Sequence, residues 1–99
     1  MPTVKELLQN VKPTTIVGPT NVVVGKPVAD SRKVEQGDCF FAITGTVADG
    51  HKFIDDCIAK GATAIVCERL PATLHPEVCY VQVQSASFTM GVMAHQFYG

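Results

Sequence analysis

The loop from Thr44 to Gly50 holds the strongest candidates for chemistry in this chain of 99 residues. It reads Thr-Gly-Thr-Val-Ala-Asp-Gly and joins an apolar run, which predicts a strand, to an amphipathic run, which predicts a helix. α/β proteins collect anionic ligands at such junctions, because unpaired backbone N–H groups face them. Gly45 and Gly50 let the backbone approach a ligand closely, and Thr44 and Thr46 supply hydroxyls. The loop favours a diphosphate or sugar ligand, although an ordinary strand-to-helix connection explains these residues equally well.

A second polar cluster precedes the same apolar strand. Asp30 and Ser31 are typical of an Asx turn, in which the Asp carboxylate accepts a backbone N–H and the Ser hydroxyl stays free. That hydroxyl suits donation to a phosphate oxygen, and Arg32 or Lys33 supplies positive charge beside it. A strand-end turn with solvated cations is an equally good interpretation of these residues alone.

Asp49 and His51 lie where the helix after the loop should begin. We interpret Asp49 as a helix cap, because a free carboxylate would repel a phosphate unless helix N–H groups already engaged its oxygens. Asp49 should therefore orient the loop rather than act as a base. His51 favours a surface or packing role over ligand contact.

Groups for catalysis or metal binding do not occur at useful spacings. The sequence has no GxxxxGK[ST] phosphate loop and no Ser/His/Asp or Cys/His arrangement. Its four cysteines lack a CxxC spacing and its three histidines are scattered, so buried thiols are favoured over disulfides or metal ligands. The cysteines are Cys39, Cys57, Cys67 and Cys79. Binding is better supported than catalysis.

Composition narrows the class of protein. With 46% hydrophobic and 17% charged residues, the chain is expected to fold around one core rather than remain disordered. Neither a membrane-spanning run nor a secretory signal is visible, which predicts a soluble, cytoplasmic protein without membrane insertion. The net charge of −1, with scattered Lys and Arg, argues against a nucleic-acid partner.

Periodicity and turn residues predict the elements that position these groups. A capping box at Thr3 and Glu6 starts a short helix that ends before Pro13, and Gly61 stops the helix that follows the loop. Strands are predicted over 14–17, 21–24, 39–43, 62–67 and 79–84, and helices over 3–12, from Asp49 to about Lys60, and from Ser85 or Ser87 to the end.

The expected fold class is α/β. Strand, helix and strand over 39–67 should form a right-handed βαβ unit with parallel strands. We expect a single small domain, with a mixed, mostly parallel sheet of about five strands flanked by about three helices. The last helix is apolar on more than one face, which favours a domain cut from a longer protein.

These motifs, in this order, resemble the amino-terminal domain of the Mur ligases, and the resemblance covers nearly the whole chain. The segments that carry it are Asp30-Ser31-Arg32-Lys33-Val34, Gly37-Asp38, Phe40-Phe41-Ala42-Ile43, Gly45, Asp49-Gly50-His51, Phe53-Ile54, Lys60-Gly61-Ala62, Tyr80-Val81-Gln82-Val83 and His95-Gln96-Phe97-Tyr98-Gly99.

The resemblance implies that residues 1–99 are the UDP-substrate-binding domain of a ligase of peptidoglycan synthesis. The parent would add the third stem-peptide residue, diaminopimelate or lysine, to UDP-N-acetylmuramoyl-L-alanyl-D-glutamate. ATP and magnesium would bind a central domain, and the incoming amino acid a carboxy-terminal domain, both absent from this chain. The fragment alone, without a cofactor, is therefore expected to be inactive.

Family contacts to the UDP moiety fall on the main chain of Ala29, the hydroxyl of Ser31 and the segment Thr46-Val47-Ala48. The supporting positions are Asp30, Gly45, Asp49 and Gly50. Two other interpretations remain open. One is the same domain from the sister ligase that adds D-alanyl-D-alanine; the other is a non-enzymatic α/β module whose loop and last helix bind a protein partner.

Overall fold

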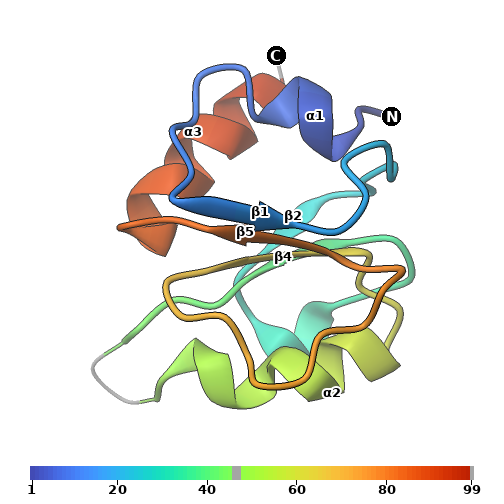
Figure 1. The fold of residues 1–99 in the computed structure, drawn as a ribbon, viewed down its shortest axis with the longest axis vertical. Coiled ribbons are helices and arrows are strands. Elements are labelled where there is room, and N and C mark those ends of the chain that lie inside the picture. Colours follow the sequence, from blue (N-terminus) through green and yellow to red (C-terminus); the bar gives the residue numbers. More distant parts are fainter. Residues whose placement is uncertain (46–47, 99) are drawn as a thin grey trace.

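Five strands form one mixed sheet in the order β1-β5-β4-β3-β2 (Figure 1). The computed structural model describes residues 1–45 and 48–98. The strands are β1 (Thr15–Val17), β2 (Pro27–Val28), β3 (Cys39–Phe41), β4 (Ala64–Cys67) and β5 (Cys79–Gln82). β1 pairs antiparallel with β5, and every other pair is parallel. The predicted α/β class and mostly parallel sheet are confirmed.

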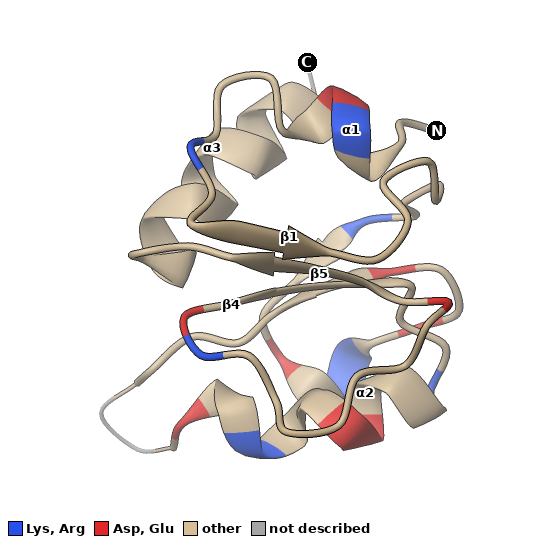
Figure 2. Cartoon of the chain, in the orientation of Figure 1, with Lys and Arg blue, Asp and Glu red and all other residues tan. Residues whose placement is uncertain are grey.

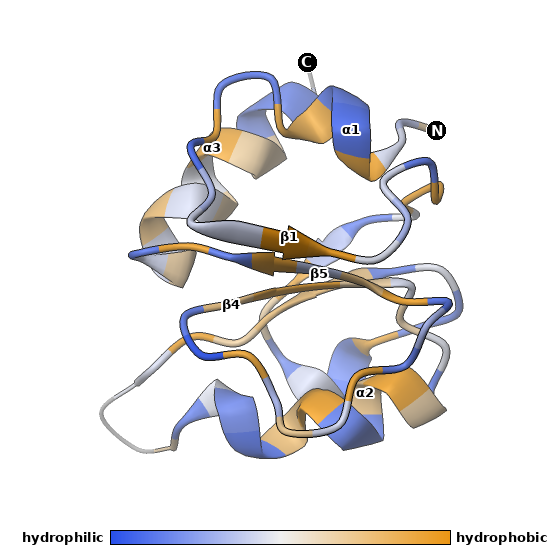
Figure 3. Cartoon of the chain, in the orientation of Figure 1, coloured by the Kyte–Doolittle hydropathy of each residue, from blue (hydrophilic) through white to orange (hydrophobic). Residues whose placement is uncertain are grey.

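In the described part of the chain, three α-helices cover the two faces of the sheet. They are α1 (Val4–Leu7), α2 (Ile54–Ala59) and α3 (Ala86–Tyr98), and two 3₁₀ turns accompany them, η1 (Ser31–Lys33) and η2 (Gly50–Phe53). α1 and α3 lie on one face and α2 on the other (Figure 1). Figure 3 shows both hydrophobic and hydrophilic residues on α1 and α2, as expected of helices with one face on a sheet.

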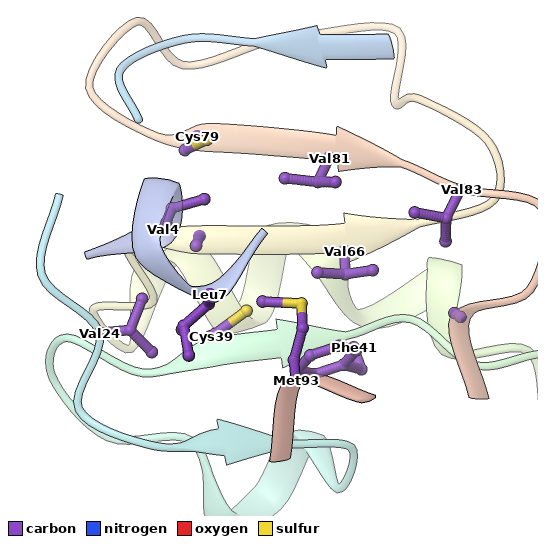
Figure 4. Packing of buried hydrophobic residues seen from close by; sticks show 12 residues of the cluster. Val4, Leu7, Val24, Cys39, Phe41, Val66, Cys79, Val81, Val83 and Met93 are labelled. Carbon is purple, nitrogen blue, oxygen red and sulfur yellow. The ribbon is translucent and has the colours of Figure 1, made fainter. Parts of the chain in front are cut away.

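Side-chain alternation along the strands builds two hydrophobic clusters, one on each face of the sheet, rather than the one core expected from the composition. Phe41, Val66 and Val81 pack with Met93 of α3 and Leu7 of α1 (Figure 4). Their neighbours along the strands point to the opposite face, where Phe40, Ile65 and Tyr80 pack with Ile54 and Cys57 of α2. Because helices cover both faces, β3 and β4 are buried along their whole length, which explains their continuous apolar runs.

The predicted βαβ unit is present as β3, α2 and β4, with Phe40 opposite Ile65 in parallel register. Gly61 ends the helix with a φ of 106°, a conformation that favours glycine. The helix differs from the prediction only at its start, where η2 forms a 3₁₀ turn before α2 begins at Ile54.

The predicted strand over 21–24 is wrong. Its backbone pairs with the start of the chain, where Val4 N donates to Val22 O and Val24 N donates to Pro2 O at 3.0 and 2.8 Å. This pairing leaves the segment with an isolated β-bridge between Thr3 and Val23. The strand that pairs with β3 in the sheet is β2 instead. The capping box of Thr3 and Glu6 is confirmed, but α1 ends at Leu7.

Candidate functional site

A concavity of about 290 Å³ opens at the carboxyl ends of β2 and β3. Because these strands are parallel, the segments that follow them meet at the same edge of the sheet, where α/β proteins bind ligands. The residues that line the concavity are Ala29, Asp30, Ser31, Arg32, Ile43, Ala48, Gly50 and Phe53.

The first wall is the turn that follows β2. Asp30 caps η1, and its Oδ1 accepts from Arg32 N at 3.0 Å, so the predicted Asx turn is confirmed. The Arg32 guanidinium also donates to both carboxylate oxygens, at 3.1 and 3.0 Å. The side-chain bonds from Arg32 have the largest effect on the pKa of Asp30, and the backbone bond from Arg32 has the next largest. Together they lower this pKa from 3.8 to about 2. The turn therefore carries an ionised Asp30 already paired with Arg32.

Ser31 lies half-buried at the mouth of this turn. Lys60 Nζ, from the end of α2, donates to the Ser31 carbonyl at 2.9 Å and fastens the turn to the helix. Ser31 lines the concavity, and its hydroxyl makes no hydrogen bond to the described residues 1–45 and 48–98.

The second wall is the loop that follows β3. Thr44 and Asp49 form an antiparallel bridge, and Gly45 N donates to Ala48 O at 3.1 Å. Gly50 N donates to Ile43 O at 2.9 Å, which closes the base of the loop. A Cβ at Gly50 would lie 2.8 Å from Ile43 N and 3.0 Å from Ile43 O, so only glycine fits without a backbone shift.

Asp49 caps η2 as predicted, because its Oδ1 accepts from His51 N at 3.0 Å. Hydrogen bonds from the backbone and side chain of His51, and then from Arg69, hold the pKa of Asp49 well below its usual range. His51 packs against the end of β4 with 9% of its side chain exposed, as the packing interpretation predicted.

The predicted residues that the structure describes fall into two groups. Ala29, Asp30, Ser31, Ala48 and Gly50 line the concavity together. Gly45 and Asp49 instead take part in the bonds that shape the loop. Thr46 and Val47 lie outside the described residues.

Two lining residues, Ile43 and Phe53, were missed by the sequence reasoning. They flank the loop on either side, within the predicted strand over 39–43 and the predicted helix from Asp49 to about Lys60. Their position next to a polar turn was the available signal. They add apolar surface to the concavity, suited to a planar ring, and the same concavity is lined by groups suited to an anion.

Other groups in the described part of the chain do not form a second chemical centre. The four cysteines are buried, and burial raises the pKa of the Cys57, Cys67 and Cys79 thiols to about 11. Residues 1–45 and 48–98 contain no group of three His, Cys, Asp or Glu that could hold a metal ion. Among the described helices, none is long and apolar enough to cross a membrane. Figure 2 shows Lys and Arg dispersed over several elements, with Asp and Glu among them.

Comparison with known proteins gives consistent matches. A family model described as "Mur ligase family, catalytic domain" matches residues 28–98. The UDP-N-acetylmuramoyl-L-alanyl-D-glutamate–2,6-diaminopimelate ligases of Bacteroides fragilis and Cytophaga hutchinsonii are each 43% identical over 96% of this chain. The chain spans about a fifth of the length of these curated relatives, since it covers 20% of each.

Solved structures of similar fold include two other ligases. The UDP-N-acetylmuramoylalanyl-D-glutamyl-2,6-diaminopimelate–D-alanyl-D-alanyl ligase of Acinetobacter baumannii has a TM-score of 0.73 at 24% identity, over 91% of this chain and 20% of that one. The MurF ligase of Thermotoga maritima, solved in complex with ADP, has a TM-score of 0.64 at 31% identity, over 79% of this chain and 18% of that one.

Proposed function

The chain belongs to the Mur ligase family, and on this premise we propose that it is the UDP-binding, amino-terminal domain of an ATP-dependent ligase of peptidoglycan synthesis. The parent enzyme adds diaminopimelate, the third stem-peptide residue, to UDP-N-acetylmuramoyl-L-alanyl-D-glutamate in the cytoplasm. Support for this member of the family comes from the names and the 43% identity of curated relatives.

The observation that carries the proposal is the shared concavity of Ser31 and the loop that contains Ala48 and Gly50. The Ser31 hydroxyl donates to a phosphate oxygen, and glycines bring the loop backbone close to the ligand. Ile43 and Phe53 supply the apolar wall for the uracil ring. The main chain of Ala29 lies beside that ring; the contacts that the family resemblance implies at Thr46 and Val47 fall outside the described residues.

Such a domain contributes to catalysis from a distance. It binds the UDP moiety of the substrate, and the central and carboxy-terminal domains of the parent act on the peptide carboxylate with ATP, magnesium and the incoming amino acid. Binding energy from this remote, unreacting part of the substrate positions the reacting group. Loss of the contacts to UDP should therefore lower the reaction rate as well as the affinity for the substrate. The domain alone is inactive, because its sequence has no phosphate loop for ATP.

The first rival within the family is the ligase that adds D-alanyl-D-alanine. Solved structures of that type resemble this chain at 24 to 31% identity. Six curated diaminopimelate ligases reach 34 to 43% identity over 95 to 96% of the chain, which favours the third-residue enzyme.

A second candidate function is a non-enzymatic interaction module. The observation that favours it is Phe88 on α3, which is 74% exposed beside two hollows of about 580 and 650 Å³. These hollows are larger than the concavity at the sheet edge. We prefer the smaller concavity because it is lined by the Asx turn at Asp30 and by the loop from Thr44 to Gly50, which is called the glycine loop from here on. Neither of these segments borders the hollows along α3.

The experiment that tests the proposed function is an assay of the full-length ligase with ATP, magnesium and UDP-N-acetylmuramoyl-L-alanyl-D-glutamate. Diaminopimelate and lysine are offered separately with this substrate, D-alanyl-D-alanine is offered with the UDP-linked molecule that already carries diaminopimelate, and products are identified by mass. We expect a product with diaminopimelate only, inhibition by free UDP, and no product from the 99-residue chain alone. A product with D-alanyl-D-alanine alone would assign the chain to the sister enzyme, and no nucleotide-dependent product would favour the interaction module.

A further inference from the structure

We propose that His51 is a positioning residue for the nucleotide, because it fastens the glycine loop to the end of the central strand β4. Asp49 and Arg69 complete this clasp, which is defined here as Asp49, His51 and Arg69. The inference deepens the proposed function and rests on it.

The bonds of His51 define the protonation of its ring. Its Nε2 accepts from two consecutive backbone amides, Glu68 N at 3.0 Å and Arg69 N at 3.2 Å. An acceptor nitrogen carries no proton, so the ring proton must lie on Nδ1. Nδ1 then donates to Asp49 Oδ1 at 2.7 Å. The clasp therefore requires a neutral imidazole in one tautomer.

Asp49 links the ring to the loop itself. Its Oδ1 accepts from the backbone N of His51 at 3.0 Å, and its Oδ2 accepts from the Arg69 guanidinium. Asp49 also forms the β-bridge with Thr44, so it closes the loop at the same time. One carboxylate thus joins the loop, the start of η2 and the segment after β4.

The far end of the clasp is fixed to the body of the domain. The Glu68 carboxylate accepts from Ala86 N at 2.9 Å, where α3 begins, and Gln82 Nε2 donates to Glu68 O at 3.2 Å. Glu68 is therefore held by β5 and α3, and it anchors this end of the clasp. Fixed partners of this kind hold binding groups within the small tolerance that recognition requires.

The clasp acts through its neighbours rather than on the ligand. Neither Asp49 nor His51 lines the concavity, but Ala48 and Gly50, on either side of Asp49, both do. A displacement of Asp49 would therefore move two lining residues together. This geometry separates a positioning role from direct contact with the nucleotide.

Two substitutions separate the bonds of His51. In His51→Asn the side-chain amide reproduces the donor to Asp49 but is too short to reach the amides of Glu68 and Arg69. In His51→Gln the carbonyl oxygen occupies the place of Nε2 and accepts from those amides, while the donor to Asp49 is lost. Lys52→Gln, an exposed change on the same turn, is the control.

The 99-residue chain and its variants are titrated with UDP by NMR, and urea unfolding is measured in parallel. We expect His51→Asn to weaken UDP binding about tenfold or more, a loss of about 1.4 kcal/mol. His51→Gln should recover part of that loss, and Lys52→Gln should bind UDP like the parent chain. The ring-nitrogen shifts of the parent should show Nδ1 protonated and Nε2 unprotonated.

If the parent binds UDP and folded His51→Asn binds it equally well, the inference is overturned and the proposed function stands. If the parent chain does not bind millimolar UDP, both fail. Should His51→Asn be unfolded, Arg69→Gln provides the second test, because among the described residues this exposed side chain bonds only to Asp49 Oδ2. A folded Arg69→Gln variant with weakened UDP binding supports the clasp, and one with unchanged binding overturns it.

Discussion

Ser31 and Gly50 line the same concavity, although they follow different strands of the sheet. The parallel pairing of β2 and β3 brings their carboxyl ends to one edge and makes this possible. The two residues bring different properties, because Ser31 offers a hydroxyl and Gly50 allows a close backbone approach.

Replacing Ser31 with Ala in the full-length ligase should weaken use of the UDP-linked substrate and leave ATP binding unchanged. A hydroxyl bonded to a charged phosphate contributes about 1.5 to 3 kcal/mol, so kcat/KM should fall roughly tenfold to a hundredfold. Steady-state kinetics with each substrate varied in turn measures this effect. Ser87→Ala, on the exposed face of α3, is the matched control. Equal kinetics for Ser31→Ala and the parent enzyme would remove Ser31 from the site.

Replacing Gly50 with Ala should distort the loop. The added Cβ would lie 2.8 Å from Ile43 N and 3.1 Å from Ala42 Cα, and these backbone atoms cannot rotate away. We expect lower stability to urea together with weaker UDP binding. Gly91→Ala is the control, because its Cβ meets no described atom within 4 Å and alanine favours the helix by about 0.5 to 1 kcal/mol. Unchanged UDP binding in Gly50→Ala would mean that the loop does not hold the ligand.

Asp38 should be important for stability although it lies outside the site. Asp38 is 2% exposed, and its carboxylate accepts from Glu35 N at 2.8 Å and pairs with Lys26 Nζ at 2.7 Å. Asp38→Ala leaves both donors without this partner and should lower the free energy of unfolding by about 1 to 3 kcal/mol. Urea unfolding at pH 7 measures the difference.

Glu35→Ala is the control for Asp38, because Glu35 pairs with the same ammonium at 2.6 Å but is 77% exposed. An exposed pair of this kind contributes little to stability. If the two variants were equally stable, the burial of Asp38 would have no energetic consequence.

Acid should loosen the turn after β2. The pKa of Asp30 is lowered from 3.8 to about 2 by Arg32, so the ionised carboxylate stabilises the folded turn above pH 3.8. This contribution is lost as the pH falls through 3.8 towards 2. NMR titration of the Asp30 carboxyl carbon should give a midpoint near 2, and Arg32→Ala should raise it. A midpoint at the ordinary value in the parent chain would show that the pairing with Arg32 does not persist in solution.

The local sequence predicted much of the fold because several signals agreed. The apolar runs of β3 and β4, the cap at Asp49 and the stop at Gly61 each indicated the same βαβ unit. The segment 21–24 was misread because β-branched residues suit an extended chain, but the extended chain pairs here with residues 2–5 rather than in the sheet.

The sequence predicted the turn and the loop of the candidate site. It did not predict the apolar lining residues Ile43 and Phe53, or the contact of His51 with the segment after β4. Asx and capping chemistry is local, so the sequence predicted the behaviour of Asp30 and Asp49. The contact of His51 with Glu68 and Arg69 depends on how β3 and β4 pair, which no local pattern encodes.

The most direct test of the central claim is an NMR titration of the 99-residue chain with UDP, with assigned backbone amides. We predict saturable shifts at Ala29, Ser31, Gly45, Ala48 and Gly50, with little change at Phe88 and Val92 beside the hollows of α3. Shifts confined to α3, or no saturable shift at millimolar UDP, would contradict a nucleotide site at the ends of β2 and β3.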